Sequence, residues 1–95
     1  MKVSCLPRFY EELEVIIDFI ADDNINRAIE FLDTLTEKIL DIPNRPHSYR
    51  KRKNTKYLES RELIYKAYCV PFFIDKESDT IVILGIYNQN LWKED

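Results

Sequence analysis

The chain has 95 residues, of which 45% are apolar, and it contains a single glycine and four prolines. This length suffices for one hydrophobic core, so we expect a single domain over residues 1–95, and the apolar content excludes a disordered tail. The net charge is −3 and no apolar run exceeds a few residues, which excludes a membrane-spanning helix.

The N-terminal segment predicts a short strand followed by a helix. Its first residues, MKVSCLPRFYEELEV, place charged residues and a proline where a signal peptide would be apolar, so we expect a cytoplasmic protein. Lys2 to Leu6 form the strand, and Pro7 suits the first helical turn, where its missing N–H has no partner. The helix is expected to run from about Pro7 to Ala21, with one apolar face made by Phe9, Leu13, Ile16, Ile17 and Ile20.

A second amphipathic helix follows closely. The turn Asp22-Asp23-Asn24 offers side-chain oxygens that can cap a helix. Pro43 and Pro46 end the helix, because proline lacks the backbone donor and disfavours helix in the residue before it. So short a connection makes the two helices antiparallel, and each apolar face then needs a sheet to cover it. The predicted buried face consists of Ala28, Leu32, Leu35, Ile39 and Ile42.

The second half of the chain predicts three strands, Glu62 to Tyr65, Ala67 to Ile74 and Thr80 to Ile86, with Asp75 to Asp79 as a hairpin loop. Pro71 cannot donate to a strand ladder, so we expect a bulge or an edge-facing position there. Gly85 predicts close approach of another backbone. The predicted fold is α+β: an N-terminal strand and an antiparallel helical hairpin packed on one face of an antiparallel sheet, which three C-terminal strands complete.

Residues that could hold a metal or a cofactor are scarce. Cys5 and Cys69 fall in predicted strands, which favours reduced, buried thiols over the alternative of a disulfide. One histidine and no close cysteine pair argue against a metal site, and a single glycine argues against a phosphate-binding loop. His47 is expected to be an exposed loop residue. We expect no cofactor.

Positive charge gathers in one segment of an acidic chain. Six of the 14 basic residues, and no acid, lie between Arg45 and Lys56, whereas the other eight share the chain with all 17 acids. Such a run can be a solvated loop. It can equally be a contact for phosphates or for an acidic protein surface.

Two motifs and the order of the elements carry a resemblance to a known family. Arg61-Glu62-Leu63-Ile64 and Ile81-Val82-Ile83-Leu84, in the order strand, helix, helix and three strands, resemble the ParE/RelE superfamily of toxins from bacterial toxin–antitoxin systems. The resemblance covers nearly the whole chain. The chain departs from the family at Cys69, where an arginine is expected, and at Tyr87-Asn88-Gln89-Asn90, which replaces a basic end.

The resemblance implies a toxin that a cognate antitoxin neutralises by wrapping a segment around it, with operator DNA bound through the antitoxin. ParE-like members bind DNA gyrase, whereas RelE-like members cleave ribosome-bound messenger RNA without a metal. A thiol at Cys69 cannot offer a bidentate cation to a phosphate, so we favour gyrase as the target. The alternatives are a ribosome-dependent RNA endonuclease, or a non-toxic relative that only binds its antitoxin.

Candidate site residues follow from the cationic segment and the aromatic C-terminal end. Trp92 can anchor an interface, or alternatively pack on the core or fray. No catalytic residue is assigned. A nuclease would have to draw its catalytic groups from Arg50, Arg52, Lys53, Lys56, Arg61, Lys66 and Tyr87. The predicted target-binding residues are Arg50, Lys51, Arg52, Lys53, Lys56, Arg61, Tyr87 and Trp92.

Overall fold

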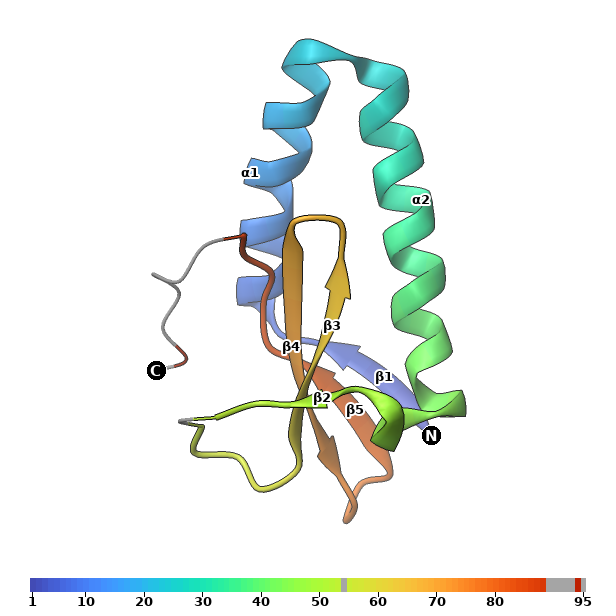
Figure 1. The fold of residues 1–95 in the computed structure, drawn as a ribbon, viewed down its shortest axis with the longest axis vertical. Helices are drawn as coiled ribbons and strands as arrows, with labels where there is room; N and C mark the ends of the chain where they lie inside the picture. Colours follow the sequence, from blue (N-terminus) through green and yellow to red (C-terminus); the bar gives the residue numbers. More distant parts are fainter. Residues whose placement is uncertain (54, 89–93, 95) are drawn as a thin grey trace.

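The computed structural model describes residues 1–53, 55–88 and 94, and it has the predicted α+β architecture. Both helices lie against one face of a sheet, and the turn that joins them projects beyond the β3–β4 hairpin (Figure 1). The elements in chain order are β1 (Lys2–Cys5), α1 (Pro7–Asp23), α2 (Ile25–Asp41), the 3-10 turns η1 (Ile42–Asn44) and η2 (Pro46–Ser48), β2 (Arg50–Lys51), β3 (Ser60–Tyr65), β4 (Tyr68–Asp75) and β5 (Thr80–Ile83).

The helical hairpin turns at a single residue. Asn24 ends α1, with its N–H bonded to the Ile20 carbonyl at 2.9 Å, and it also caps α2. Its side-chain oxygen accepts from the Arg27 N–H at 3.1 Å, which satisfies one of the free donors of the first turn. The first helix therefore extends two residues beyond the predicted end at Ala21. The second helix stops where predicted, because Pro43 forces the chain into a 3-10 turn.

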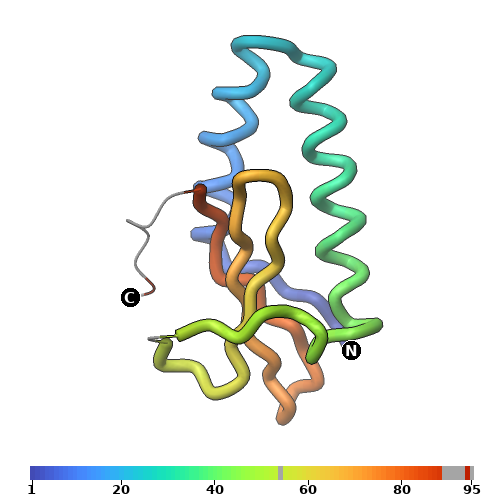
Figure 2. Tube along the Cα trace, in the orientation of Figure 1, coloured from blue at the N-terminus to red at the C-terminus, as the bar shows by residue number. Residues whose placement is uncertain are grey.

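The sheet has the order β1-β5-β4-β3-β2 and is mixed. The pairs among β2 to β5 are antiparallel, as predicted, but β1 pairs with β5 in parallel, with Val3 opposite Ile81. The two-residue strand β2 was not predicted, because no apolar alternation marks it. In Figure 2 the start of the chain lies beside the end of α2, where β1 forms one edge of the sheet.

A bulge lies opposite Pro71, as predicted. Phe72 pairs with Ile83, and the next pair along is Cys69 with Tyr87, so two residues of β4 face three residues on the other side. Pro71 has no N–H for this ladder, and its carbonyl accepts from Leu84 at 2.9 Å. The extra residue ends β5 at Ile83, three residues before the predicted end, and brings Tyr87 beside β4.

Side-chain alternation divides the sheet into a covered face and an open face. The covered face meets the helices through Leu63, Val70, Phe72, Ile81 and Ile83, all of them buried. The predicted face of α1 packs against this core, with Phe9 buried and Leu13, Ile16, Ile17 and Ile20 partly buried.

The predicted face of α2 is correct at four positions and wrong at Leu32. Ala28, Leu35, Ile39 and Ile42 are buried, whereas Leu32 is 37% exposed. The neighbouring Phe31 takes its place, because its ring packs between two aromatic rings of the sheet, 5.3 Å from those of Tyr65 and Tyr68.

Candidate functional site

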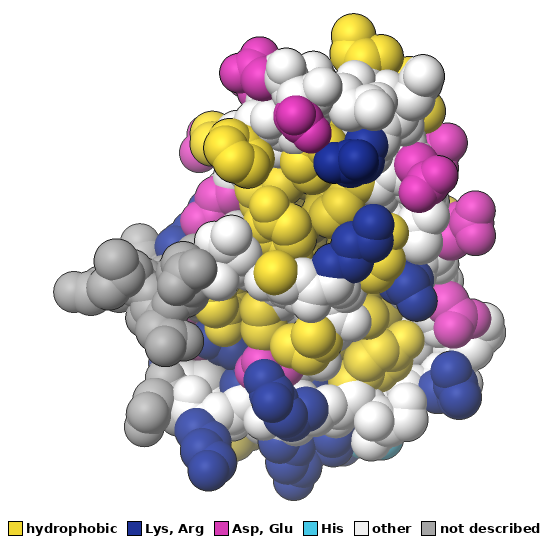
Figure 3. Space-filling model, turned by 45° about the horizontal axis from the view of Figure 1, so that its top comes forward, with side chains coloured by type: hydrophobic (Ala, Val, Ile, Leu, Met, Phe, Trp, Pro, Cys, Tyr) yellow, Lys and Arg dark blue, Asp and Glu magenta, His cyan; other side chains and the backbone are white. Residues whose placement is uncertain are grey.

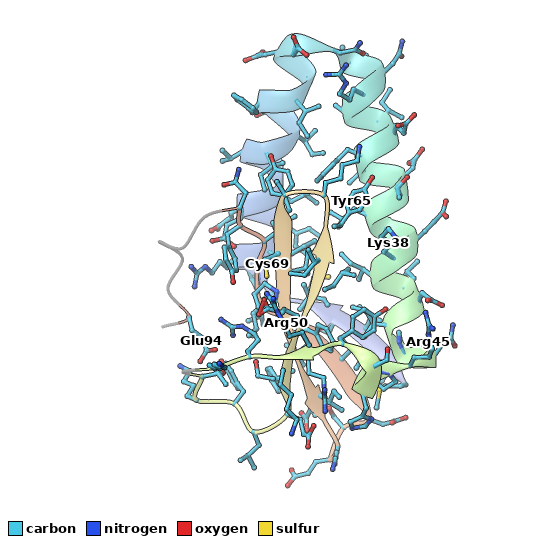
Figure 4. The ribbon with its side chains drawn as sticks, in the orientation of Figure 1. Lys38, Arg45, Arg50, Tyr65, Cys69 and Glu94 are labelled. Atoms are coloured by element: carbon cyan, nitrogen blue, oxygen red, sulfur yellow. The ribbon has the colours of Figure 1, made fainter. Side chains whose placement is uncertain are left out.

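The open face of the sheet carries a polar cluster made by three strands. In the registered pairs Arg50 lies opposite Glu62, and Cys69 lies opposite Ile64. Alternation puts Glu62 and Cys69 on the face turned away from the helices. Arg50 Nη2 lies 2.8 Å from Glu62 Oε2, and Cys69 Sγ donates to the same oxygen at 2.9 Å. Figure 4 shows Arg50 and Cys69 close together on this face.

Tyr87 completes the cluster through the bulge. Cys69 N–H donates to the Tyr87 carbonyl at 2.7 Å, and Tyr87 N–H returns a bond to the Cys69 carbonyl at 3.0 Å. The cluster borders an open pocket of about 220 Å³ on the edge of the sheet. The residues that line this pocket are Arg50, Glu62, Ile64, Lys66, Ala67, Tyr68, Cys69, Tyr87 and Asn88.

The protonation states of the cluster follow from burial and from these contacts. Burial, and then the hydrogen bond to Glu62, raises the pKa of the Cys69 thiol to about 11. Burial, and then contact with Cys69, raises the pKa of Tyr87 to about 12. Burial opposes ionisation of Glu62, but the donors from Arg50 and Cys69 outweigh it and lower its pKa. At neutral pH the thiol and the phenol are therefore protonated, and the carboxylate is charged.

The structure does not bring the predicted target-binding residues together in one patch. Lys51, Lys53 and Lys56 have exposed side chains, whereas Arg52 and Arg61 are largely buried. Lys51 pairs with Arg61 and so faces away from Arg50. Figure 3 shows basic side chains gathered at one end of the molecule, over β2 and its loop, and acids along the helices.

Arg61 has a structural contact that the sequence did not reveal. Its side chain is 10% exposed, and Nη1 donates to the Tyr49 carbonyl at 2.8 Å. Its Nη2 lies 3.8 Å from Glu59 Oε2. The guanidinium thereby holds the segment that leads into β2. Trp92 lies outside the described residues, so its predicted role stays a prediction.

Two acidic residues of the site were not identified from the sequence. Glu62 lies inside the Arg-Glu-Leu motif, but its contact with Arg50 depends on β2, which no pattern predicts. Glu94 is close to the chain end, and it meets Arg52 from 42 residues away. Each of these two arginines of the cationic segment is thus paired with a carboxylate of the chain itself.

Cys5 and Cys69 are free thiols, as predicted, but each is half-buried. Among the described residues, no group of three His, Cys, Asp or Glu is placed to hold a metal ion. None of the described helices is long and apolar enough to cross a membrane.

Comparison with known proteins identifies the family. Residues 3–90 match the family described as "ParE toxin of type II toxin-antitoxin system, parDE". The chain belongs to the ParE toxin family. The matched range runs from within β1 to beyond β5, so it rests on most of the chain and not on one motif.

Solved structures of toxin–antitoxin complexes share the fold of this ParE-family toxin. A chain of the chromosomal ParDE system from Pseudomonas aeruginosa is 16% identical with a TM-score of 0.73, covering 93% of this chain and 95% of that one. A chain of the RelBE2 complex from Mycobacterium tuberculosis is 18% identical with a TM-score of 0.65, covering 93% and 96%. A comparison with curated protein sequences found no significant match.

Proposed function

We propose that this ParE-family toxin arrests growth by binding DNA gyrase, and that a cognate antitoxin neutralises it. The observation that carries the choice of target is the ion pair between Arg50 and Glu62, 2.8 Å apart on the open face of the sheet. RNA cleavage needs cations that stabilise a pentavalent phosphate, and a carboxylate at this position cancels that charge and repels the phosphate.

The protonation states of the cluster also argue against RNA cleavage. A general base must accept the proton of the ribose 2′-hydroxyl near neutral pH. The pKa of Cys69 is about 11 and that of Tyr87 is about 12, so both groups already hold their protons. Glu62 is ionised, but its carboxylate already accepts from Arg50 and Cys69. Binding to gyrase requires a surface and not such a catalytic arrangement.

The exposed lysines of the β2 segment, which we define as residues 50–56, supply a surface for the target. Lys51, Lys53 and Lys56 are exposed on one short stretch of chain, and the exposed guanidinium of Arg50 lies on the opposite face of β2 from Lys51. A group of like charges attracts an acidic protein surface or gyrase-bound DNA, and it sets the association rate. We propose that these residues make the first contact with gyrase.

The antitoxin requires a different surface, and the helices carry a suitable one. Ile25, Ile29 and Leu40 on one side of α2 are between 55% and 64% exposed, which leaves a stripe of large apolar side chains in water. The stripe continues into a groove of about 410 Å³, where Leu32 and Leu40 face Tyr10 of α1 and Val3 of β1. An amphipathic segment that folds on binding buries its apolar side in such a groove. Operator DNA would then be bound through the antitoxin, because the helices of the toxin are acidic.

Two assays on one preparation of the purified toxin distinguish gyrase from ribosome-bound messenger RNA as the target. Purified toxin should make purified gyrase accumulate cleaved plasmid DNA, while messenger RNA on translating ribosomes stays intact. A matched pair of variants adds specificity: Lys53→Ser should lower the yield of cleaved DNA, and Lys2→Ser, on the opposite edge strand β1, should not. Cuts in ribosome-bound messenger RNA with gyrase unaffected would assign the toxin to the endonucleases. No effect in either assay, from protein that inhibits growth in cells, would require another target.

A further inference from the structure

The carboxylate of Glu94 lies in a set of donors supplied by the loop between β2 and β3. Its Oε2 accepts from Arg52 Nη1 at 2.7 Å and from the Thr55 hydroxyl at 2.6 Å, and its Oε1 accepts from the Lys56 N–H at 2.9 Å. Both oxygens are therefore used. The Arg8 side chain also donates to the Glu94 carbonyl at 3.3 Å. Figure 4 shows Glu94 beside the loop that follows β2.

Two of these donors also have contacts within the loop and β3. The side chain of Arg52 is 9% exposed and lies along the sheet, 3.5 Å from the Ser60 hydroxyl. Thr55 is held in place because its oxygen also accepts the Tyr57 N–H at 3.2 Å. A guanidinium, a hydroxyl and a backbone N–H that converge on one point are the groups that proteins use to bind a carboxylate.

The electrostatics of this site agree with an ionised occupant. Burial opposes ionisation of Glu94, but the bonds from Thr55, the Lys56 N–H and Arg52 outweigh it and lower its pKa. Arg52 also acts on the polar cluster, since its charge helps to lower the pKa of Glu62 and partly offsets the rise in the pKa of Tyr87. The donor set therefore lies next to the candidate functional site, within the cationic segment.

We propose that Arg52, Thr55 and the Lys56 amide form a carboxylate-binding site, which Glu94 fills in the free toxin and which an acidic side chain of a partner protein takes over. The occupant seen in the structure is a carboxylate with both oxygens bonded, which favours an acidic peptide over a phosphate as the external ligand. The surrounding lysines would attract an acidic segment to the site. The proposal does not depend on gyrase being the target.

An internal occupant weakens every external ligand for the same site. The apparent dissociation constant equals the intrinsic one divided by the fraction of molecules in which the site is free. A single charge-assisted bond of ordinary net strength is enough to leave such a site free in only about one molecule of ten. Removing the Glu94 carboxylate should therefore tighten the binding of an acidic peptide by about tenfold or more.

The test uses a fluorescently labelled hexaglutamate peptide and the full-length toxin at low salt, with binding measured by anisotropy. We expect Glu94→Ala and Glu94→Gln to bind the peptide about tenfold more tightly than wild type, and Glu94→Ala with Thr55→Val to lose most of this gain. Glu30→Ala is the matched control, because it removes one exposed acid on α2, away from the site. It should bind the peptide as wild type does.

Thermal melts identify variants that fail to fold, and Glu94→Gln provides a second folded variant if Glu94→Ala is unstable. Equal affinities of wild type and both folded Glu94 variants would overturn the proposal. So would an equal gain in Glu30→Ala, which would attribute the effect to net charge. Inorganic phosphate and a short single-stranded RNA are tested in parallel. A gain for these ligands without a gain for the peptide would show a phosphate site, and would overturn the assignment to acidic proteins.

Discussion

Arg50 and Glu62 lie in register across the β2–β3 pair, and their side chains meet at 2.8 Å on the open face of the sheet. The same Glu62 oxygen accepts the thiol proton of Cys69 at 2.9 Å. The arginine that the family pattern places at position 69 would be a second cation in this pocket. With a thiol there, the carboxylate is shared between one cation and one neutral donor, and the charges of this pair cancel.

Removing the Glu62 charge should make the Cys69 thiol more acidic. Burial is the first cause of the raised pKa of Cys69, about 11, and the hydrogen bond to Glu62 is the second. In Glu62→Gln the pKa of the thiol should fall, although burial still keeps it above the ordinary value. The measurement is the pH dependence of alkylation by iodoacetamide in a Cys5→Ser background, so that one thiol reacts. An unchanged profile would contradict the contact between the two side chains.

Acidification should destabilise the toxin through Glu62 and Glu94, whose pKa values are both lowered in the folded protein. Groups of this kind stabilise the fold fully above their unfolded-state pKa, near 4.5. That stability is lost as the pH falls through the lower folded-state values. The midpoint of urea unfolding should therefore decrease below about pH 4.5, and decrease less in Glu62→Gln. Equal slopes for wild type and this variant would show that Glu62 does not contribute.

The fold was largely predictable because its patterns are periodic. The faces of both helices and the strands of the second half repeat at helical or strand spacing, and Pro71 predicted the bulge because it lacks a backbone donor. Leu32 was misplaced because Phe31 and Leu32 are adjacent on the helix and both apolar. The aromatic rings on β3 and β4 decided between them, and spacing along one helix carries no information about those rings.

The contacts of the site were less predictable, because they join segments far apart in the chain. The cationic run was visible in the sequence, but the pairing of Arg50 with Glu62 requires a two-residue strand without any apolar alternation. The contact of Arg52 with Glu94 spans 42 residues. The direction of the parallel β1–β5 pair was missed for the same reason, because residue order does not state which edge of the sheet the first strand joins.

Two leucines one turn apart on α2 distinguish a core position from a surface position. Leu35 is 1% exposed, so Leu35→Ala should lower the free energy of unfolding by roughly 2 to 5 kcal/mol through lost contacts and a cavity. Leu32→Ala, one turn earlier and 37% exposed, should change it by about 0.5 kcal/mol. Chemical denaturation of both variants gives the comparison. Similar losses at the two positions would contradict the burial described for α2.

Neutralising the exposed lysines of the β2 segment should reduce toxicity without unfolding the protein. Lys51, Lys53 and Lys56 contribute about 0 to 1 kcal/mol each to stability as exposed charges, so their combined replacement by Ser should leave the melting temperature nearly unchanged. Growth inhibition should fall, because electrostatic attraction sets the rate of association with the target. The matched control replaces Lys2, Arg27 and Lys38, three exposed basic residues on β1 and α2, and should remain toxic. Equal toxicity of the two triple variants at equal abundance would assign the loop to solubility.

A charge placed on the apolar stripe of α2 should weaken neutralisation by the antitoxin and leave the toxicity of the chain unchanged. Ile29 and Leu40 are 55% and 62% exposed, so Ile29→Glu and Leu40→Glu bury no new charge in the free toxin. In a complex with the antitoxin the same charge would be desolvated against an apolar segment, which should weaken binding by about tenfold or more. Cells that express both proteins should then stop growing, as we expect them to do without the antitoxin. Val15→Glu, on an exposed side of α1 outside the groove, is the control and should still be neutralised. Full neutralisation of both stripe variants, with affinities equal to wild type, would place the antitoxin on another surface.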